Sequence, residues 1–150
     1  MRKALIVIGG TAAVAVAVYL VTLIVALHGQ NDTRNKNKAA ADAEVVVGAH
    51  TYADRLNAAL RVAPQPFNDV VALAPKGLSD TVGSRRTPGA LTLTFDVTKT
   101  FVGPPAGGVA GHCYSEVLTA ADVVSQANLT EIPCSQMMPV LGPGQIISGP

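Results

Sequence analysis

The hydrophobic pattern divides the chain into a continuous apolar run near the N-terminus and a longer part in which apolar and polar residues alternate. Residues 4–27 carry no charged side chain and follow directly after Arg2 and Lys3. A helix of these 24 residues is about 36 Å long, and the hydrocarbon core of a bilayer is about 30 Å thick. A soluble helix of this length would show a polar stripe, and none is present. Residues 4–27 are therefore predicted to form a single transmembrane helix.

The length of the apolar run also bears on whether it is removed. A cleavable signal peptide has an apolar region of about 7–15 residues that ends at a small-x-small site. Such sites occur inside the run, at 13–15 and 15–17, but the chain stays apolar beyond them to Leu27. Further sites at 39–43 lie well past the end of the run. An uncleaved signal anchor is favoured, with cleavage as the alternative.

The orientation of this anchor depends on basic residues that nearly balance across it. The basic residues of segment 1–3 directly precede the run, whereas the second basic cluster starts at Arg34, seven residues beyond its end. The positive-inside rule weights charges close to the span. A cysteine pair in the C-terminal part favours an oxidising compartment. We therefore expect segment 1–3 in the cytoplasm and residues 28–150 outside the membrane.

Small residues repeat on one side of the predicted span. Gly9, Ala13 and Ala17 recur at every fourth position, which places them on one helix face. Small residues allow helices to approach closely in lipid. The simpler interpretation is an alanine-rich helix without a partner. Homo-association through this face, or packing against other spanning helices, is kept as an alternative.

Two stretches are predicted to lack a packed core. Residues 28–38 contain no apolar side chain, and segment 28–44 as a whole is predicted to be a polar spacer beside the lipid headgroups. Its basic residues could contact anionic lipid. At the other end, residues 139–150 are rich in Gly and Pro and are predicted to be a flexible tail.

Between them, residues 45–138 are predicted to form a small α+β domain. Apolar residues in Ala49–Val62 recur at i, i+3, i+4 and i+7, which predicts one amphipathic helix that ends before Pro64. Segment 69–74 fits either a strand or one helical turn, and segment 79–89 is expected to be a loop.

The second half of this domain is predicted to contain a short antiparallel sheet. In Ala90–Val102 apolar residues alternate with Thr and Asp, as in a half-buried strand. A second strand is expected at His112–Thr119, antiparallel to the first, and a third at Leu129–Pro133. Thr119 is a candidate N-cap for a short helix over 120–127.

The net charge of the domain indicates which kinds of partner it can bind. Residues 39–150 hold six Lys or Arg and nine Asp or Glu, a formal charge of −3, and their aromatic residues are not interleaved with basic ones. This composition argues against nucleic-acid binding. The expected partners are the bilayer and a protein of the cell envelope.

Cys113 and Cys134 are the only cysteines. An isolated pair outside the cytoplasm is predicted to form a disulfide. A zinc site would need two further ligands, and a catalytic thiol would need a histidine held by an orienting group. Neither arrangement is evident, and no metal or cofactor is expected.

Two polar pairs are candidate ligand or partner contacts. His50 and Asp54 are one helical turn apart, so a carboxylate could hold the imidazole as a base, although such pairs are usually exposed surface contacts. Arg85 and Arg86 lie beside glycines in the expected loop and could bind a phosphate or carboxylates, or could be solvated.

Sequence motifs for catalysis are missing. The chain has no GxSxG, HExxH, GxxxxGK[ST], GxGxxG or CxxC pattern. The leading hypothesis is therefore a membrane-anchored extracytoplasmic binding or structural module. The alternatives are a small hydrolase-like enzyme that uses His50 or His112, and an accessory subunit of a membrane transport complex.

Overall fold

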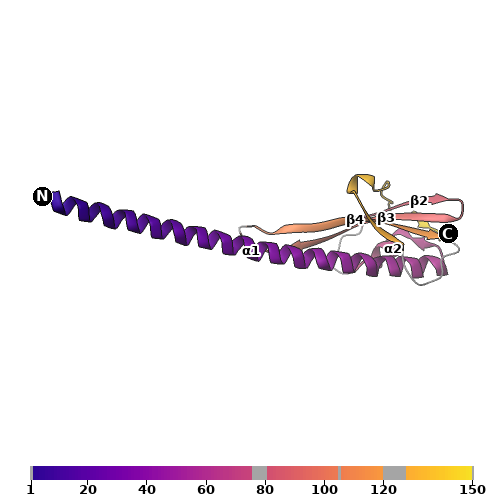
Figure 1. Cartoon of the computed structure of the whole chain (residues 1–150). Helices are drawn as coiled ribbons and strands as arrows, with labels where there is room; N and C mark the ends of the chain where they lie inside the picture. The colour runs from indigo at the N-terminus through magenta and orange to yellow at the C-terminus, as the bar shows by residue number, and fades with distance from the viewer. Residues whose placement is uncertain (1, 76–80, 105, 120–127, 150) are drawn as a thin grey trace.

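The computed structural model shows one long helix with an antiparallel sheet packed along its C-terminal half (Figure 1). The structure describes residues 2–75, 81–104, 106–119 and 128–149, with side chains from residue 16 onward. Helix α1 (Arg2–Val62) is continuous over 61 residues. The predicted α+β class is confirmed as a long helix with antiparallel sheets.

The described elements after α1 are β1 (Gln65–Pro66), α2 (Phe67–Ala72), β2 (Val82–Thr87), β3 (Ala90–Phe101), β4 (Gly108–Thr119), β5 (Leu129–Ile132), the 3-10 helix η1 (Cys134–Gln136) and β6 (Ile146–Ile147). In the described part of the chain, the main sheet has four antiparallel strands in the order β2-β3-β4-β5. A second, two-stranded sheet pairs β1 with β6 near the C-terminal end of α1.

The predicted strands at Ala90–Val102, His112–Thr119 and Leu129–Pro133 are confirmed within one to four residues at their ends. Strands β3 and β4 pair in register over their whole length. The alternation places four apolar residues of β3 against α1, each at most 2% exposed: Leu91, Leu93, Phe95 and Val97.

The predicted helix Ala49–Val62 is the last part of α1, and its apolar face is the other half of the core. Tyr52 and Leu56 are fully buried, and the Tyr52 ring meets the Phe95 ring edge-on with centroids 5.0 Å apart. The Tyr52 hydroxyl donates to the Val70 carbonyl at 3.0 Å, which ties α2 to α1. Burial of each such side chain stabilises the fold by about 1.5–3 kcal/mol.

The expectation of a polar spacer over 28–44 is wrong in its second part. The whole segment is helical, and the core already includes Ala41, which is 4% exposed. Val45, the first residue of the expected domain, is fully buried. The side chains of 28–38 are exposed as expected. The segment is nevertheless helical, because the residues that follow it in the helix are packed in the core and because the β3–β4 turn docks on it.

The loop expected over 79–89 is corrected in part to strand β2. Little apolar alternation marks this strand, because it lies at an edge of the sheet and takes its hydrogen bonds from β3. The reversal falls at Pro88 and Gly89, where Gly89 has a φ of 79°, which glycine adopts without strain.

The expectation of a flexible tail is also wrong. Gly83 forms a bridge with Val140, and the Leu141 amide donates to the Val82 carbonyl at 2.8 Å. Ile147 of β6 is 3% exposed and joins the core. The tail is held by backbone pairing with residues far away in the sequence.

Segment 69–74, left open between strand and helix, is largely helical as part of α2. The helix expected over 120–127 lies outside the described residues. In the part of the chain whose side chains the structure describes, no helix is both long enough and apolar enough to cross a membrane. The predicted span 4–27 is only partly covered by those side chains, which begin at Val16.

Candidate functional site

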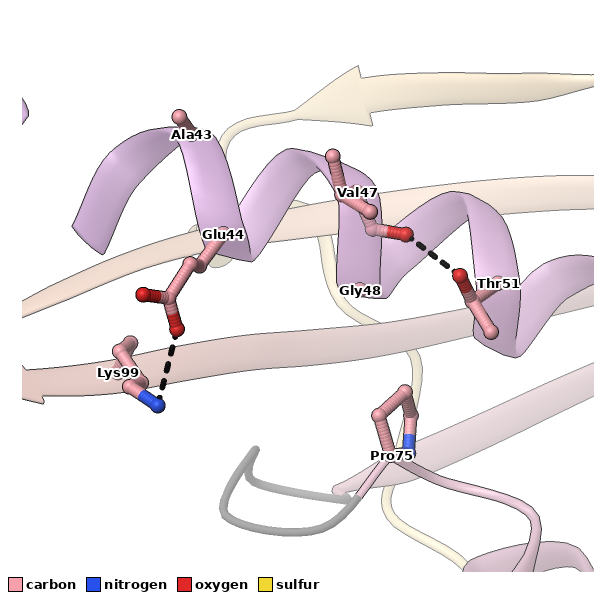
Figure 2. Close-up of a pocket in the computed structure, with 7 residues that line it drawn as sticks. All are labelled: Ala43, Glu44, Val47, Gly48, Thr51, Pro75 and Lys99. Carbon is pink, nitrogen blue, oxygen red and sulfur yellow. Dashed lines mark hydrogen bonds and ion pairs between the residues drawn. The ribbon is translucent and has the colours of Figure 1, made fainter. Parts of the chain in front are cut away.

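A groove of about 420 Å³ lies between α1 and β3 (Figure 2). Five of its residues are on α1, one is on β3, and one follows α2. They are Ala43, Glu44, Val47, Gly48, Thr51, Pro75 and Lys99. The lining is mostly apolar, and its charged groups lie together at one end (Figure 2).

The polar groups of the groove already have partners. Lys99 Nζ lies 3.0 Å from Glu44 Oε2, and both side chains are partly exposed to solvent. Thr51 Oγ1 donates to the Val47 carbonyl at 2.9 Å. The Val47 side chain is 67% exposed. The groove therefore offers an apolar wall beside an exposed ion pair, a combination that suits an apolar side chain next to a charged one.

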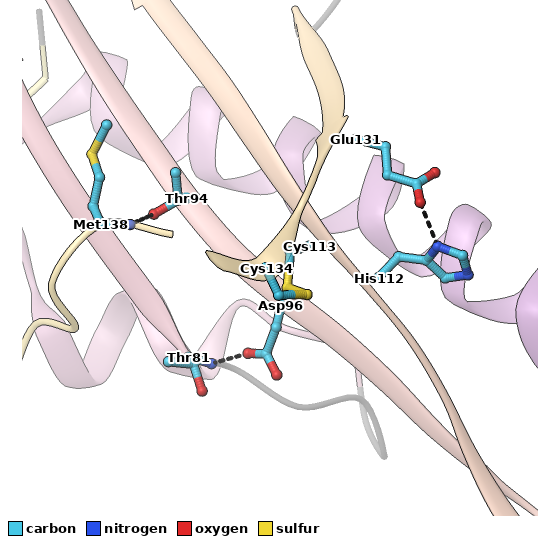
Figure 3. The surroundings of a disulfide bond; sticks show 8 residues. All are labelled: Thr81, Thr94, Asp96, His112, Cys113, Glu131, Cys134 and Met138. Carbon is cyan, nitrogen blue, oxygen red and sulfur yellow. Dashed lines mark hydrogen bonds and ion pairs between the residues drawn. A yellow bond between two sulfur atoms is a disulfide. The ribbon is translucent and has the colours of Figure 1, made fainter. Parts of the chain in front are cut away.

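A second polar cluster joins α1, β4 and β5. His112 Nδ1 lies 2.6 Å from Glu131 Oε1, as Figure 3 shows, and His112 Nε2 lies 3.7 Å from Asp42 Oδ1. The Lys38 ammonium, 2.7 Å from Asp42, lowers the pKa of that carboxyl, and His112 contributes less. In the described part of the chain, no group of three potential ligands has a geometry that holds a metal ion. His112 of β4 therefore contacts both α1 and β5, and its interactions connect these three elements.

The predicted disulfide between Cys113 and Cys134 is confirmed, with Cα atoms 5.2 Å apart (Figure 3). It joins the middle of β4 to η1. Near it, the Thr81 amide donates to Asp96 Oδ1 at 3.0 Å, and the Met138 amide donates to Thr94 Oγ1 at 3.0 Å. The disulfide and the Met138–Thr94 bond hold the C-terminal segment across the face of the sheet opposite α1, whereas the Thr81–Asp96 bond fixes the start of β2 on β3.

Glu116 of β4 is a site residue that the sequence did not single out. Its side chain is fully buried, and neither carboxyl oxygen has a hydrogen-bond partner among the described residues. Burial raises the pKa of Glu116 to about 8, the Asp54 carboxylate adds to the rise, and Arg61 opposes it. The alternation of β4, which puts Glu116 on the same face as Tyr114 and Leu118, could have revealed this position.

Neither of the two predicted polar pairs forms a joint site in the structure. His50 and Asp54 are exposed on α1, and no hydrogen bond or ion pair joins them within the described residues. Arg85 is exposed on the edge strand β2. Arg86 instead binds the tail, because its Nη2 donates to the carbonyls of Ser148 and Gly149.

The candidate packing residues of the span are only partly visible. Ala17 is exposed on α1, whereas the surroundings of Gly9 and Ala13 lie outside the part of the chain for which the structure describes burial. Comparison of the chain with protein-family models, with curated proteins and with solved structures finds no match.

Proposed function

We propose that this chain is a membrane-anchored extracytoplasmic binding module whose α1–β3 groove contacts an envelope protein. The observation that carries the proposal is the exposure of the apolar part of α1. Nine large apolar side chains between Val16 and Leu27 are each 43–67% exposed, although the apolar face of the same helix is buried against the sheet between Ala41 and Leu60.

Such a surface is unfavourable in water. Contiguous apolar patches on soluble monomers rarely exceed a few hundred Å² unless they bind something. The exposed residues lie on all sides of the helix, so one docked partner face would leave part of them in water. A bilayer surrounds a helix completely, and the sequence continues the apolar run back to Ala4.

The side of the membrane is inferred from the cysteines. A disulfide is stable in oxidising compartments and rare in the cytoplasm. Cys113 and Cys134 join strand β4 to the segment that crosses the sheet, so the bond is part of the domain architecture. This supports an extracytoplasmic domain.

The anchoring is tested with the full chain expressed in cells and membranes washed at alkaline pH. Val16→Lys combined with Leu20→Lys places two charges in the middle part of the predicted span, at a cost of up to about 2.5–3.5 kcal/mol each. We expect the double variant to leave the membrane fraction. Val62→Lys, at a position 86% exposed at the far end of α1, is the matched control and should stay in it. Release of the unmodified chain by the wash would contradict the proposal.

Binding at the groove is tested by photo-crosslinking in cells. A photoreactive residue at Val47 should give one defined adduct with an envelope protein, and the same residue at Val62 should not. Thr51→Arg fills the groove and should remove the Val47 adduct. Equal adducts at both positions, or an adduct that survives Thr51→Arg, would show that the groove is not the contact.

A further inference from the structure

A second hollow, of about 580 Å³, lies at the end of the domain nearer the N-terminus of α1. One wall belongs to α1 and the other to the β3–β4 hairpin, whose turn end points back along the helix toward its N-terminus (Figure 1). It is lined by Asn31, Arg34, Asn35, Lys38, Phe101, Gly108 and Val109.

The hairpin turn is fixed on the helix at this place. Asn37 Nδ2 donates to the Val102 carbonyl at 2.7 Å. Gly103 packs so closely that a Cβ atom on it would lie 3.2 Å from Arg34 Cγ. The turn and the helix therefore form one surface.

The distance along the helix places this surface at the level of lipid headgroups. Arg34 follows Leu27 by seven residues, about 10 Å at 1.5 Å per residue. The headgroup layer extends about 5–8 Å beyond the hydrocarbon core, and the long side chains of Arg and Lys can reach toward it. If the apolar run ends at the edge of the hydrocarbon core, the Arg34 side chain reaches the phosphates. Lys38 lies about 16 Å beyond Leu27 along the helix axis, so a tilt of the helix toward the hairpin brings Lys38 and the docked turn to the same level.

The chemistry of the surface matches that location. Between positions 28 and 42 the three basic residues Arg34, Lys36 and Lys38 outnumber the two acidic residues Asp32 and Asp42, of which Asp42 is paired with Lys38 at 2.7 Å. Next to them, Val102 is 83% exposed and Val109 62% exposed. Cations beside exposed apolar side chains are typical of segments that bind at the interface of an anionic membrane.

We propose that Arg34, Lys38, Val102 and Val109, here called the juxtamembrane surface, bind the headgroups of anionic phospholipids in the bilayer that holds α1. The proposal rests on the proposed anchoring. Because the turn is docked on the helix, the contact fixes how the domain stands on the membrane. The groove at Val47 then lies about 20 Å beyond Arg34 along α1, on the side away from the membrane.

The test uses tryptophan fluorescence, because the chain has no natural Trp. The full-length Val102→Trp variant is reconstituted in vesicles whose acyl chains carry bromine close to the headgroup, either of phosphatidylcholine alone or with phosphatidylglycerol. We expect several-fold stronger quenching with phosphatidylglycerol. In that membrane, Arg34→Gln with Lys38→Gln should return the quenching to the phosphatidylcholine level. Val62→Trp, at the far end of α1, should be quenched in neither membrane.

A third reporter separates this inference from the anchoring. Leu20→Trp should be quenched in both membranes. Quenching at position 20 without quenching at position 102, or equal quenching at position 102 in both lipids, would overturn the juxtamembrane surface and leave the anchor standing. No quenching at position 20 would overturn the anchoring itself and the headgroup contact with it.

Discussion

The two ends of helix α1 have the same backbone and opposite surroundings. From Val16 to Lys38 every described side chain is exposed, whether apolar or polar. From Ala41 to Leu60 one face is buried against β3 and β4, and the other carries exposed polar residues such as Asp54 and Arg55.

The difference follows from how apolar residues are spaced. In the second part they recur every three or four residues, so a sheet on one side covers them all. In the first part they occupy nearly every position up to Leu27, so no single face can cover them. One continuous helix can therefore have two different surroundings. The spacing of its apolar residues, and not their number alone, indicates which surroundings each part has.

Truncation of one leucine in each part should give the largest contrast. Leu56 is fully buried, so Leu56→Ala should lower the free energy of unfolding by about 2–5 kcal/mol. Leu23 is 43% exposed and touches no core residue, so Leu23→Ala should change it by less than about 0.5 kcal/mol. Denaturant unfolding in detergent measures both. Similar losses would show that the apolar end packs on the domain.

Loss of the disulfide should come next. The bond closes a loop between residues 21 positions apart, which by chain entropy stabilises the domain by about 3 kcal/mol. Cys113→Ala with Cys134→Ala should lower the Tm accordingly, and reduction of the unmodified protein should lower it by a similar amount. A reductant that still lowers the Tm of the double variant would place the effect elsewhere.

The free energy of unfolding should depend on pH through Glu116 of β4, which is buried in the domain. Its pKa is about 8 in the folded state against an ordinary value of 4.5, so between these values the folded protein holds a proton that the unfolded chain lacks. Stability should therefore fall as pH rises through this window, by at most about 1.4 kcal/mol per unit. Glu116→Gln should flatten this profile. An unchanged profile in the variant would assign the slope to another group.

The contact between the hairpin turn and the helix should give the smallest effect. Asn37→Ala removes the hydrogen bond to the Val102 carbonyl and should cost about 0.5–1.5 kcal/mol. Asn35→Ala, two residues away on the exposed helix surface, is the matched control and should be nearly neutral. Hydrogen exchange at the Val102 and Gly103 amides should rise only in the first variant.

Local patterns were sufficient for much of the fold. The alternation of apolar and polar residues in Ala90–Val102 predicted β3, because a strand depends on residues close in the sequence. The disulfide could be predicted because the chain has only two cysteines, which allow one pairing. The edge strand β2 and the pairing of the tail depend on partners elsewhere in the chain. Gly83 meets Val140, and Gln65 pairs with Ile147, contacts that no local pattern contains.

The candidate sites were harder to predict because they combine elements. The groove brings Glu44 of α1 to Lys99 of β3, 55 positions apart in the sequence, and neither residue belongs to a motif. The polar segment 28–38 gave no sign that the β3–β4 turn would dock on it. Prediction of such contacts requires the register of the helix on the sheet, which the sequence pattern does not contain.

Thiol labelling in intact cells that express the full chain tests directly whether the domain lies outside the membrane with its disulfide formed. A membrane-impermeant maleimide is applied with and without prior reduction. We expect Cys113 and Cys134 to be labelled in intact cells only after reduction, as the proposed extracytoplasmic location of the domain and its disulfide require. Labelling without reduction, and only after the cells are lysed, would place a reduced domain in the cytoplasm and contradict the account.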